Sequence, residues 1–282
     1  MNRYEDLKDF LKKYKRVIVA FSGGIDSYFV LKAAVDSLGK ENVLAVTGDS
    51  PSLKSAEKHQ TNILASEIGA EHKIIFTEEM ENPEYINNPT NRCFFCKDEL
   101  FTKLEGVKNE LKYDVILDGT NHDDLSDYRP GFRASRNHGI TSPLVDLKFS
   151  KNEIRETAKE LGLTIWNKPS SPCLSSRIPY GQKVTVEKLS MIEKAEEVLM
   201  QLGFNEFRVR HFEIQQNGNE EKLKLAKVDI SLNEMKNVLN EDIFSEIHCK
   251  LNEIGYDFVT LDMGGLKSGS LNVNIKSSQT NN

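Results

Sequence analysis

Four short apolar runs, each separated from the next by a helical pattern, most constrain what this sequence can fold into. They are Val17 to Phe21, Val43 to Val46, His72 to Phe76 and Asp114 to Asp118. Helices are expected over a stretch that carries Phe29 to Leu38, over Ser55 to Ile68, over Cys96 to Leu111 and over Lys151 to Leu161. Strands that alternate with helices form parallel sheets covered on both faces. The first half is therefore predicted to be an α/β domain with a doubly wound parallel sheet.

The second half of the chain has a different pattern and indicates a smaller α+β domain. A loop rich in proline and serine, from Trp166 to Lys183, separates the two halves. After it, helices are expected over Thr185 to Leu202 and Asp242 to Glu253, and strands over Phe204 to Ile214, Lys222 to Ile230 and Tyr256 to Leu261. The first two strands alternate like an antiparallel pair joined by a turn. We expect a first domain over 1–165, an active-site linker loop over 166–184, a small domain over 185–275 and a disordered tail over 276–282.

Charge and composition exclude several classes of function. The 282 residues carry 37 Lys and Arg against 43 Asp and Glu, and this net charge of −6 argues against a chain built around nucleic acid. No apolar run reaches the roughly 18 residues of a membrane span, and the polar start is unlike a secretory signal, so a cytoplasmic protein is expected. Four cysteines in such a chain indicate thiols or metal ligands rather than disulfides. One of them, Cys249, lies near Ile247 and Leu251 and is predicted to be a buried, small apolar residue.

The run Ser22-Gly23-Gly24-Ile25-Asp26-Ser27 lies where the first strand meets a helix. Two glycines allow a tight turn with unobstructed N–H groups, and the helix dipole and the two serine hydroxyls favour an anion such as a phosphate. The alternative is an ordinary turn in which Asp26 and Ser27 cap the helix. No Walker lysine is present, because Ile25 and Asp26 stand where Gly-Lys would be expected. By itself, the spacing predicts an anion site.

A second polar turn, Asp118-Gly119-Thr120-Asn121, follows the fourth strand. In an open parallel sheet, the carboxyl ends of the strands line the ligand crevice. Because the first turn lies at the same edge, we expect Gly119, Thr120 and Asn121 to contact a nucleotide. A strand-to-loop turn with a helix cap is the alternative.

Three cysteines are able to converge on one site: Cys93 and Cys96, which form a C-x-x-C pair, and Cys173. A closed zinc site would need a fourth ligand, such as His122 or His138. A redox pair of the thioredoxin type is expected in a different strand–helix setting. Three thiolates instead suit a [4Fe–4S] cluster that leaves one iron open to an extra sulfide. Unrelated thiols are the alternative to all of these sites.

Together these motifs resemble those of the LarE family of ATP-dependent sulfur transferases, within the PP-loop superfamily of ATP pyrophosphatases. The resemblance covers residues from about 15 to 273 and begins with the glycine-rich run, which has the SGGxDS form of the superfamily. It continues in Gly119-Thr120-Asn121 with Asp127-Tyr128-Arg129-Pro130-Gly131, in Pro169 to Gly181, in Arg208-Val209-Arg210-His211 and in Gly255 to Asn272. The stretch Pro172-Cys173-Leu174-Ser175-Ser176-Arg177 is highly specific.

The resemblance implies an enzyme that adenylates a substrate carboxylate, releases pyrophosphate and converts the carboxylate to a thiocarboxylate. The implied substrate is pyridinium-3,5-dicarboxylate mononucleotide, or a related small molecule, in the synthesis of the nickel-pincer nucleotide cofactor. ATP and Mg²⁺ are the implied cofactors, with Mg²⁺ neutralising the charge of the leaving pyrophosphate. The implied nucleotide contacts are Ser22, Gly23, Gly24, Asp26, Ser27, Gly119, Thr120 and Asn121. The implied partners are the small-molecule substrate and sulfide or another sulfur donor, and a homo-oligomer fits the family.

The resemblance also assigns roles to the cysteines. Cys173 matches the family's sulfur-handling cysteine, which in one branch is sacrificial and ends as dehydroalanine. Cys93 and Cys96 depart from that branch and are similar to the branch in which three cysteines carry a [4Fe–4S] cluster. The implied roles of Cys93, Cys96 and Cys173 are therefore those of catalytic metal ligands, with hydrosulfide on the open iron as the sulfur source.

Five charged residues are candidate site residues. Arg177 suits a phosphate or the adenylate, because a guanidinium matches two anionic oxygens at once; a surface arginine is the alternative. Arg208 and Arg210 share one face of a strand and indicate a site for a substrate phosphate or carboxylate, against the alternative of a solvated face. Glu196 falls near an apolar stripe and should have a partner, such as substrate or a metal, unless its carboxylate reaches the surface. Asp229 matches an acidic position of the family that helps to hold a metal or phosphate.

Three other functions share parts of this pattern. Cluster-dependent PP-loop tRNA thiolases also combine a C-x-x-C pair with a distant cysteine, but the net charge of −6 speaks against tRNA. An amidotransferase-like ATPase or a relative of NAD synthetase would give the three cysteines no task. A non-enzymatic iron–sulfur or zinc carrier would use the cysteines but not the glycine-rich run.

Overall fold

The computed structural model describes residues 3–126, 130–216, 221–267, 269 and 271. The chain divides into two compact units, of which the first comprises Met1–Asn82 and Asn91–Pro172 and the second comprises Pro83–Thr90 and Cys173–Asn282. Segment 83–90 thus belongs to the second unit although it lies in the first half of the sequence. Asp127 to Arg129 of the resemblance, much of the turn between the expected antiparallel strands, and the expected tail lie outside the described residues.

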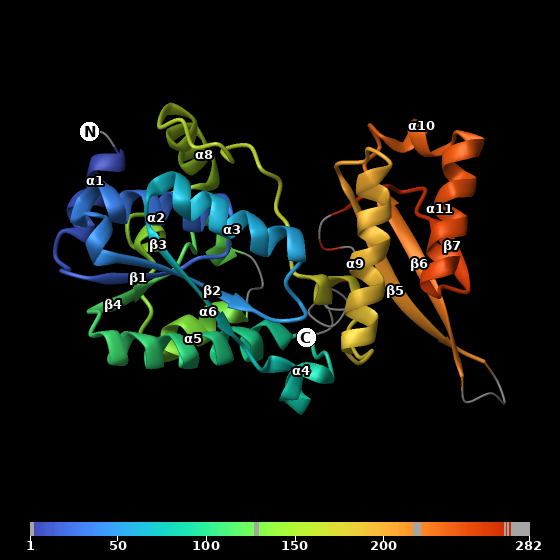
Figure 1. The fold of residues 1–282 in the computed structure, drawn as a ribbon, viewed down its shortest axis with the longest axis horizontal. Helices are drawn as coiled ribbons and strands as arrows, with labels where there is room; N and C mark the ends of the chain where they lie inside the picture. Colours follow the sequence, from blue (N-terminus) through green and yellow to red (C-terminus); the bar gives the residue numbers. More distant parts are fainter. Residues whose placement is uncertain (1–2, 127–129, 217–220, 268, 270, 272–282) are drawn as a thin grey trace. The chain divides into compact units, whose positions relative to one another are not determined.

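The first unit contains a four-stranded parallel sheet in the order β3-β2-β1-β4 (Figure 1). Its strands are β1 (Val17–Ala20), β2 (Val43–Asp49), β3 (Glu71–Phe76) and β4 (Val115–Leu117). Within the central strand, Val17 pairs with Val43 on one side and with Val115 on the other. The three neighbouring pairs are all parallel, as the alternation of strands and helices predicted.

Helices cover both faces of this sheet. Figure 1 shows α2 (Ile25–Leu38) and α3 (Ser55–Ile68) on one face and α5 (Arg92–Leu111) and α6 (Gly131–Asn137) on the other. Alternate residues of β1 point to the two faces: Val19 joins the core with α2, and Ile18 joins the core with α5. The predicted doubly wound α/β fold is confirmed. The unit also contains α1 (Arg3–Leu11), α7 (Pro143–Asp146), α8 (Lys151–Glu160) and the 3-10 turns η1 (Lys40–Asn42), η2 (Glu79–Glu81) and η3 (Asp123–Ser126).

Helix α5 begins at Arg92 rather than at Cys96, where the sequence pattern placed its start. The error arose because the buried apolar side chains that reveal the helix begin only at Phe101, whereas Cys93 is exposed. Both cysteines therefore lie at the N-terminal end of the helix. Residues three apart are neighbours on a helix surface, so Cys93 and Cys96 share one side of it.

The second unit packs two long helices, α9 (Val186–Gln201) and α11 (Glu241–Ile254), with a three-stranded sheet of order β5-β6-β7. Strands β5 (Phe207–Gln215) and β6 (Lys222–Ile230) are antiparallel, and β7 (Phe258–Leu261) is parallel to β6. The core combines residues of both helices with the sheet, and includes Leu199, Val209, Val228, Ile247 and Leu251. Three short elements complete the unit: α4 (Pro83–Ile86), η4 (Leu174–Arg177) and α10 (Met235–Val238). The predicted second, smaller α+β domain is present.

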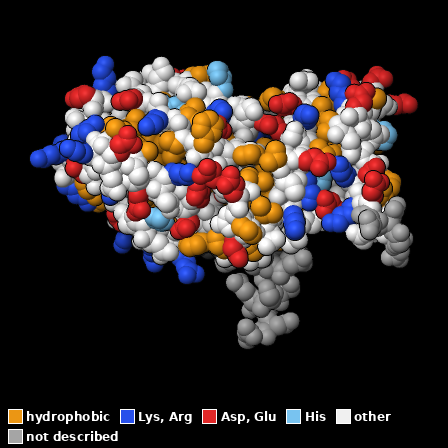
Figure 2. Space-filling view, turned by 60° about the horizontal axis from the view of Figure 1, so that its bottom comes forward, with side chains coloured by type: hydrophobic (Ala, Val, Ile, Leu, Met, Phe, Trp, Pro, Cys, Tyr) orange, Lys and Arg blue, Asp and Glu red, His pale blue; other side chains and the backbone are white. Residues whose placement is uncertain are grey.

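Charged side chains of both signs are interspersed over the face shown in Figure 2. No continuous basic patch is visible on that face. Among the described residues, no helix is long and apolar enough to cross a membrane.

Candidate active site

The glycine-rich run from Ser22 to Ser27 after β1 folds into a turn, here called the cradle, that contains hydrogen bonds of serine hydroxyl groups. The Ser27 hydroxyl donates to the carbonyl of Gly24 at 3.0 Å and lies 3.1 Å from the Ser22 hydroxyl, while the Ser22 backbone N–H donates to it at 3.3 Å. Gly23 adopts a φ of +71°, and a Cβ atom there would lie 2.9 Å from the Thr61 methyl group. Glycine is required at this position, because other residues are strained at positive φ.

The second polar turn packs directly against the cradle, at the start of α2. A Cβ atom on Gly119 would lie 2.5 Å from the backbone nitrogen of Ser27. The Asp118 carboxylate orders this turn by accepting hydrogen bonds from the Thr120 hydroxyl at 2.7 Å and the Ser135 hydroxyl at 3.2 Å. The two turns, 91 or more residues apart in sequence, meet at the carboxyl edge of the sheet as predicted.

A cavity of about 310 Å³ opens between the two turns. Its lining includes the predicted residues Ser22, Asp26, Ser27, Gly119 and Thr120, together with Val46, Thr47, Gly48, Lys97, Phe101 and Asp124. Asn121 is not part of this lining: its buried side chain accepts a hydrogen bond from the Asp124 N–H at 3.2 Å and caps the η3 turn. The Asn121 side chain therefore caps a turn, which was the alternative to a nucleotide contact.

Two lysines stand beside the cradle, and the sequence interpretation missed both of them. Lys151 and Lys168 line an adjoining cavity of about 190 Å³ together with Ser22, Gly24 and Asp26. Lys151 pairs with the Asp26 carboxylate, and Lys168 pairs with Glu57 at 2.6 Å. No local pattern reveals this arrangement, because Lys151 is 125 residues from Asp26 in the sequence.

The cysteine pair of α5 lies next to a buried acid. The Cys96 thiol is half-buried and donates to Oε1 of Glu79 at 4.0 Å, and the same oxygen accepts a hydrogen bond from the Ser52 hydroxyl at 3.2 Å. Nothing in the local sequence singled out Glu79, since it comes close to Cys96 only through the fold.

Cys173 belongs to the second unit, where it precedes η4 and is half-buried. Its carbonyl accepts a hydrogen bond from the Arg177 guanidinium at 3.2 Å. In the part of the chain that the structure describes, no three His, Cys, Asp or Glu side chains gather into a metal-binding group. Cys93 and Cys96 thus lie together on α5 in the first unit, whereas Cys173 belongs to the second unit.

His138, one of the two histidines considered as a zinc ligand, is engaged elsewhere. Its ring nitrogens lie 3.0 Å from Asp98 and 3.2 Å from Glu105. Burial opposes the charged form of the ring, but these two carboxylates raise the pKa of His138 above its usual value. A protonated imidazole has no lone pair for a metal, so this environment disfavours His138 as a ligand.

The prediction that Cys249 is a buried apolar residue is wrong. Ile247 and Leu251 face the core of the second unit, whereas Cys249 is exposed and its thiol donates to Glu253 at 3.6 Å. Residues four apart share one side of a helix, and the residue midway between them points away from it.

Four of the five charged candidates form two buried ion pairs in the second unit. Arg177 and Glu196 meet through two contacts, of 2.9 and 3.3 Å, and are 2% and 4% exposed. Arg210 donates to Asp229 at 2.5 Å, and Asp229 is fully buried. A buried carboxylate needs a partner, and the partner of Glu196 is Arg177. Arg177 is buried, so the alternative that it is a surface arginine is wrong.

Arg208 is the remaining charged candidate. It is half-buried on β5, two residues from Arg210, and therefore on the same face of the strand. Burial and the positive charges of Arg177 and Arg210 lower the pKa of Arg208 below its usual value. Among the described residues no carboxylate forms an ion pair with Arg208, so this crowded positive charge is suited to an anionic ligand.

A comparison with known protein families identifies the class of this protein. Residues 3–84 match the family described as NAD synthase. This match covers β1, the glycine-rich cradle and the parallel strands β2 and β3. The protein is thus an enzyme of the PP-loop class, with a nucleotide domain like that of NAD synthase.

Three relatives match over nearly the whole chain and identify the family. The pyridinium-3,5-bisthiocarboxylic acid mononucleotide synthase of Lactiplantibacillus plantarum is 34% identical over 270 residues, which cover 95% of this chain and 93% of its own. The uncharacterised protein slr1717 of Synechocystis is 41% identical over 96% of this chain and 97% of its own. The uncharacterised protein MJ0830 of Methanocaldococcus jannaschii is 32% identical over 91% of this chain and 94% of its own. The chain belongs to the family of the first of these relatives, the LarE family.

Proposed function

We propose that this protein is an ATP-dependent sulfur transferase that acts on pyridinium-3,5-dicarboxylate mononucleotide or a closely related small molecule. It would adenylate a carboxylate of the substrate, release pyrophosphate, and replace the adenylate by sulfur to give a thiocarboxylate for the nickel-pincer cofactor. The observation that carries the proposal is the full-length match to a bisthiocarboxylic acid mononucleotide synthase, combined with a PP-loop cavity at the sheet edge. Cys93, Cys96 and Cys173 distinguish this proposal from an NAD synthetase activity, which would give them no task.

The first unit supplies what the adenylation step needs. Backbone N–H groups between Ser22 and Ser27 would donate to the phosphates, and Gly119 and Thr120 would lie against the nucleotide. Lys151 would provide the cation that the turn itself lacks, since a PP-loop has no Walker lysine. Mg²⁺ would neutralise the pyrophosphate as it leaves, with the Asp26 carboxylate as an oxygen ligand of the kind this ion prefers.

The second unit would recognise the substrate. Its arginines suit the phosphate and carboxylates of a mononucleotide, because each guanidinium matches two anionic oxygens. Arg208 is the best placed of them to bind an anion directly, since Arg177 and Arg210 already hold Glu196 and Asp229. The two buried carboxylates would fix the arginine side chains and balance their charge.

Cys93, Cys96 and Cys173 would carry the sulfur chemistry. None of the three forms a disulfide among the described residues, and thiolates are the usual ligands of iron–sulfur clusters. A [4Fe–4S] cluster on three cysteines would supply a sulfide to the activated carboxyl carbon, from which AMP leaves. The N-terminus of α5 would offset part of the negative charge of a cluster bound there.

The test is anaerobic purification, followed by iron and acid-labile sulfide analysis and a pyrophosphate assay with ATP and the dicarboxylate mononucleotide. We expect about four irons per chain, substrate-dependent pyrophosphate release, and loss of iron in Cys93→Ala. Cys249→Ala is the matched control, because Cys249 is also an exposed helical cysteine. Iron-free protein whose Cys173 loses the mass of hydrogen sulfide during turnover would overturn the cluster and indicate sacrificial sulfur transfer. Pyrophosphate release with tRNA but not with the mononucleotide would overturn the substrate.

A further inference from the structure

Segment 83–90 belongs to the second unit and packs on the chain that follows Cys173 in the same unit. The hydroxyl groups of Tyr85 and Ser175 share a hydrogen bond of 2.6 Å, and both side chains are buried. Ser175 lies in the η4 turn, two residues after Cys173. The contact therefore ties segment 83–90 to the turn that carries this cysteine.

Asn88 makes several further contacts between the segment and the loop that follows η4. Its side-chain amide donates to the carbonyls of Ile178, Pro179 and Gln182 at 3.3, 2.8 and 3.0 Å. Its backbone carbonyl accepts from the N–H of Gly181 at 3.0 Å. Asn88 is fully buried and has a φ of +53°, a conformation that asparagine adopts more readily than most residues. One buried side chain thus holds three carbonyl groups of the loop together.

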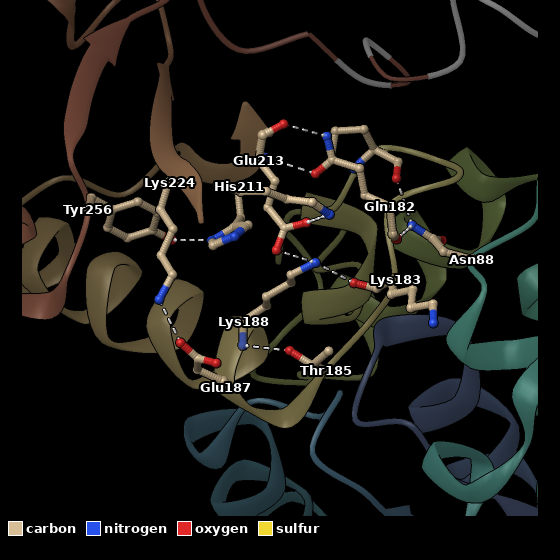
Figure 3. Close-up of polar contacts among 12 residues, drawn as sticks. Asn88, Gln182, Lys183, Thr185, Glu187, Lys188, His211, Glu213, Lys224 and Tyr256 are labelled. Atoms are coloured by element: carbon tan, nitrogen blue, oxygen red, sulfur yellow. Dashed lines mark hydrogen bonds and ion pairs between the residues drawn. The ribbon is translucent and has the colours of Figure 1, made fainter. Parts of the chain in front are cut away.

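The other side of the loop is fixed to the sheet of the second unit (Figure 3). The Gln182 side chain bonds to both backbone groups of Glu213 on β5, donating at 3.3 Å and accepting at 3.0 Å. The Glu213 carboxylate in turn pairs with Lys188 at 2.9 Å and Lys222 at 3.0 Å. Segment 83–90 is therefore anchored, through the loop, to the folded body of its own unit.

The η4 turn also contacts the arginines of the second unit. Arg177 donates to the Cys173 carbonyl at 3.2 Å and to the Ser176 hydroxyl at 2.8 Å. The charge of Arg177 acts in turn on Arg208, because it helps burial to lower the pKa of Arg208. Arg177 is paired with Glu196, whereas no carboxylate of the described residues pairs with Arg208. The backbone of Cys173 is thus bonded to an arginine that lies within electrostatic reach of this uncompensated charge.

We propose that Asn88, assisted by Tyr85, is a positioning residue that holds the turn of Cys173 beside the positive charge of Arg208. An anionic group of a substrate bound at Arg208 would then meet the Cys173 thiol in a fixed place within one unit. Removing the Asn88 amide would loosen the loop and let the turn move away from the guanidinium. The inference rests on the proposed function in that sulfur transfer to an anionic substrate gives this proximity a purpose.

The test compares the alkylation of Cys173 by iodoacetate, an anion, with its alkylation by the neutral iodoacetamide, in iron-free, full-length protein. In both reactions the thiolate sulfur forms a bond to carbon and iodide leaves. The thiolate fraction therefore cancels in the ratio of the two rates, and nearby positive charge raises this ratio at low salt. We expect the ratio, measured by peptide mass mapping, to be about tenfold higher in the folded protein than in urea. Asn88→Gly should lose most of this excess, because three hydrogen bonds to the loop are removed.

The variants separate positioning from folding. Asn88→Gly keeps the positive φ without strain, and Lys112→Gly is the matched control, since Lys112 has a φ of +56° but belongs to the first unit. Tyr85→Phe removes a single hydroxyl, keeps the ring, and should reduce the ratio by a smaller factor. Cys249, which is exposed beside Glu253, is the internal reference and should show a low ratio in every variant. Thermal unfolding verifies that each variant is folded, and a purely structural role would lower stability without changing the ratio at Cys173.

Three results would overturn the proposal. The first is an equal ratio at Cys173 in folded Asn88→Gly, in folded Tyr85→Phe and in the unaltered protein. The second is a ratio in the unaltered protein no higher than in urea. The third is a high ratio that persists in folded Arg208→Gln, since the charge near the thiol would then come from another group. Failure of the proposed function is seen separately, as absence of pyrophosphate release from protein whose ratio at Cys173 depends on Asn88 and Arg208.

Discussion

A Cβ atom on Gly119 would lie 2.5 Å from the backbone nitrogen of Ser27, and 2.8 Å from its Cα atom. The second polar turn and the glycine-rich cradle therefore touch backbone to backbone. Backbone atoms at the start of a 14-residue helix cannot move aside as a flexible side chain would. The shape of the cavity between the turns depends on this contact, because residues of both turns line it.

Gly119→Ala should therefore separate the two turns. We expect a loss of about 1–3 kcal/mol in the free energy of unfolding, as overpacking typically costs, and a larger relative loss of ATP binding. Urea unfolding and calorimetric titration with a non-hydrolysable ATP analogue measure the two effects. Gly106→Ala is the control: Gly106 lies within α5 with nothing within 4 Å of an added Cβ, so stability should stay the same or increase. Unchanged binding in Gly119→Ala would contradict the assignment.

The buried pair of Arg177 and Glu196 should be strongly coupled. Glu196→Gln leaves a guanidinium that is 2% exposed without its counter-charge, and we expect it to cost about 3 kcal/mol in the free energy of unfolding. Arg177→Met combined with Glu196→Gln should cost less than the sum of the two single changes, because the double variant buries no unpaired charge. A double-mutant cycle in urea measures the coupling. The exposed pair of Lys250 and Glu246 is the matched control and should show about 0.5 kcal/mol or less.

His211 should make the stability depend on pH. The ring is fully buried, its Nδ1 lies 3.3 Å from the Tyr256 hydroxyl, and burial, followed by the charge of Lys188, lowers the pKa of His211 to about 4. Between its unfolded value of about 6.5 and this folded value, the unfolded chain binds a proton that the folded protein does not. The stabilisation is thus complete above pH 6.5 or so and falls by about 1.4 kcal/mol per pH unit as the pH drops toward 4.

Urea unfolding near pH 7.5 and near pH 5.5 measures this dependence. Other groups also titrate in this range, so the informative quantity is the difference between the protein and His211→Gln, which keeps a polar side chain but cannot titrate. We expect that variant to lose about 1 kcal/mol less over the interval. His248→Gln is the control, since His248 is exposed on α11. An identical pH dependence in all three proteins would contradict a depressed pKa for His211.

The sequence predicted the fold wherever a local pattern had a single structural solution. The apolar runs around Ile18 and Leu44 lie in strands that are buried on both faces of the sheet. A continuous apolar run, without alternating polar residues, is typical of such strands. Helix starts were less predictable. The apolar residues Phe94 and Phe95 in the first turn of α5 are only partly buried, and the start of the helix at Arg92 was missed. Segment 83–90 gave no sign of belonging to the second unit, because its contacts are with residues about 90 positions later.

Some residues of the candidate site could also be predicted from the sequence, and others could not. Gly23 and Gly119 were predictable because backbone conformation and close approach restrict these positions to glycine. The partners of charged groups were not, since ion pairing is decided by which elements the fold brings together. Lys151 beside Asp26 and Glu79 beside Cys96 are both contacts of this kind. A sequence pattern can therefore indicate which chemistry a chain carries before it indicates the residues that tune it.

Lys151 should supply the charge that the cradle lacks. It pairs with Asp26 and lines the cavity next to Ser22 and Gly24, so a phosphate there would meet its ammonium group. In Lys151→Ala we expect pyrophosphate release to fall by about a hundredfold or more, as for removal of one electrostatic contact to a transition state. Lys151→Arg should recover part of the rate, because it keeps the charge. Lys159→Ala, on the exposed side of the same helix, is the control and should keep full activity. If Lys151→Ala releases pyrophosphate as fast as Lys159→Ala does, the phosphates are neutralised by other groups.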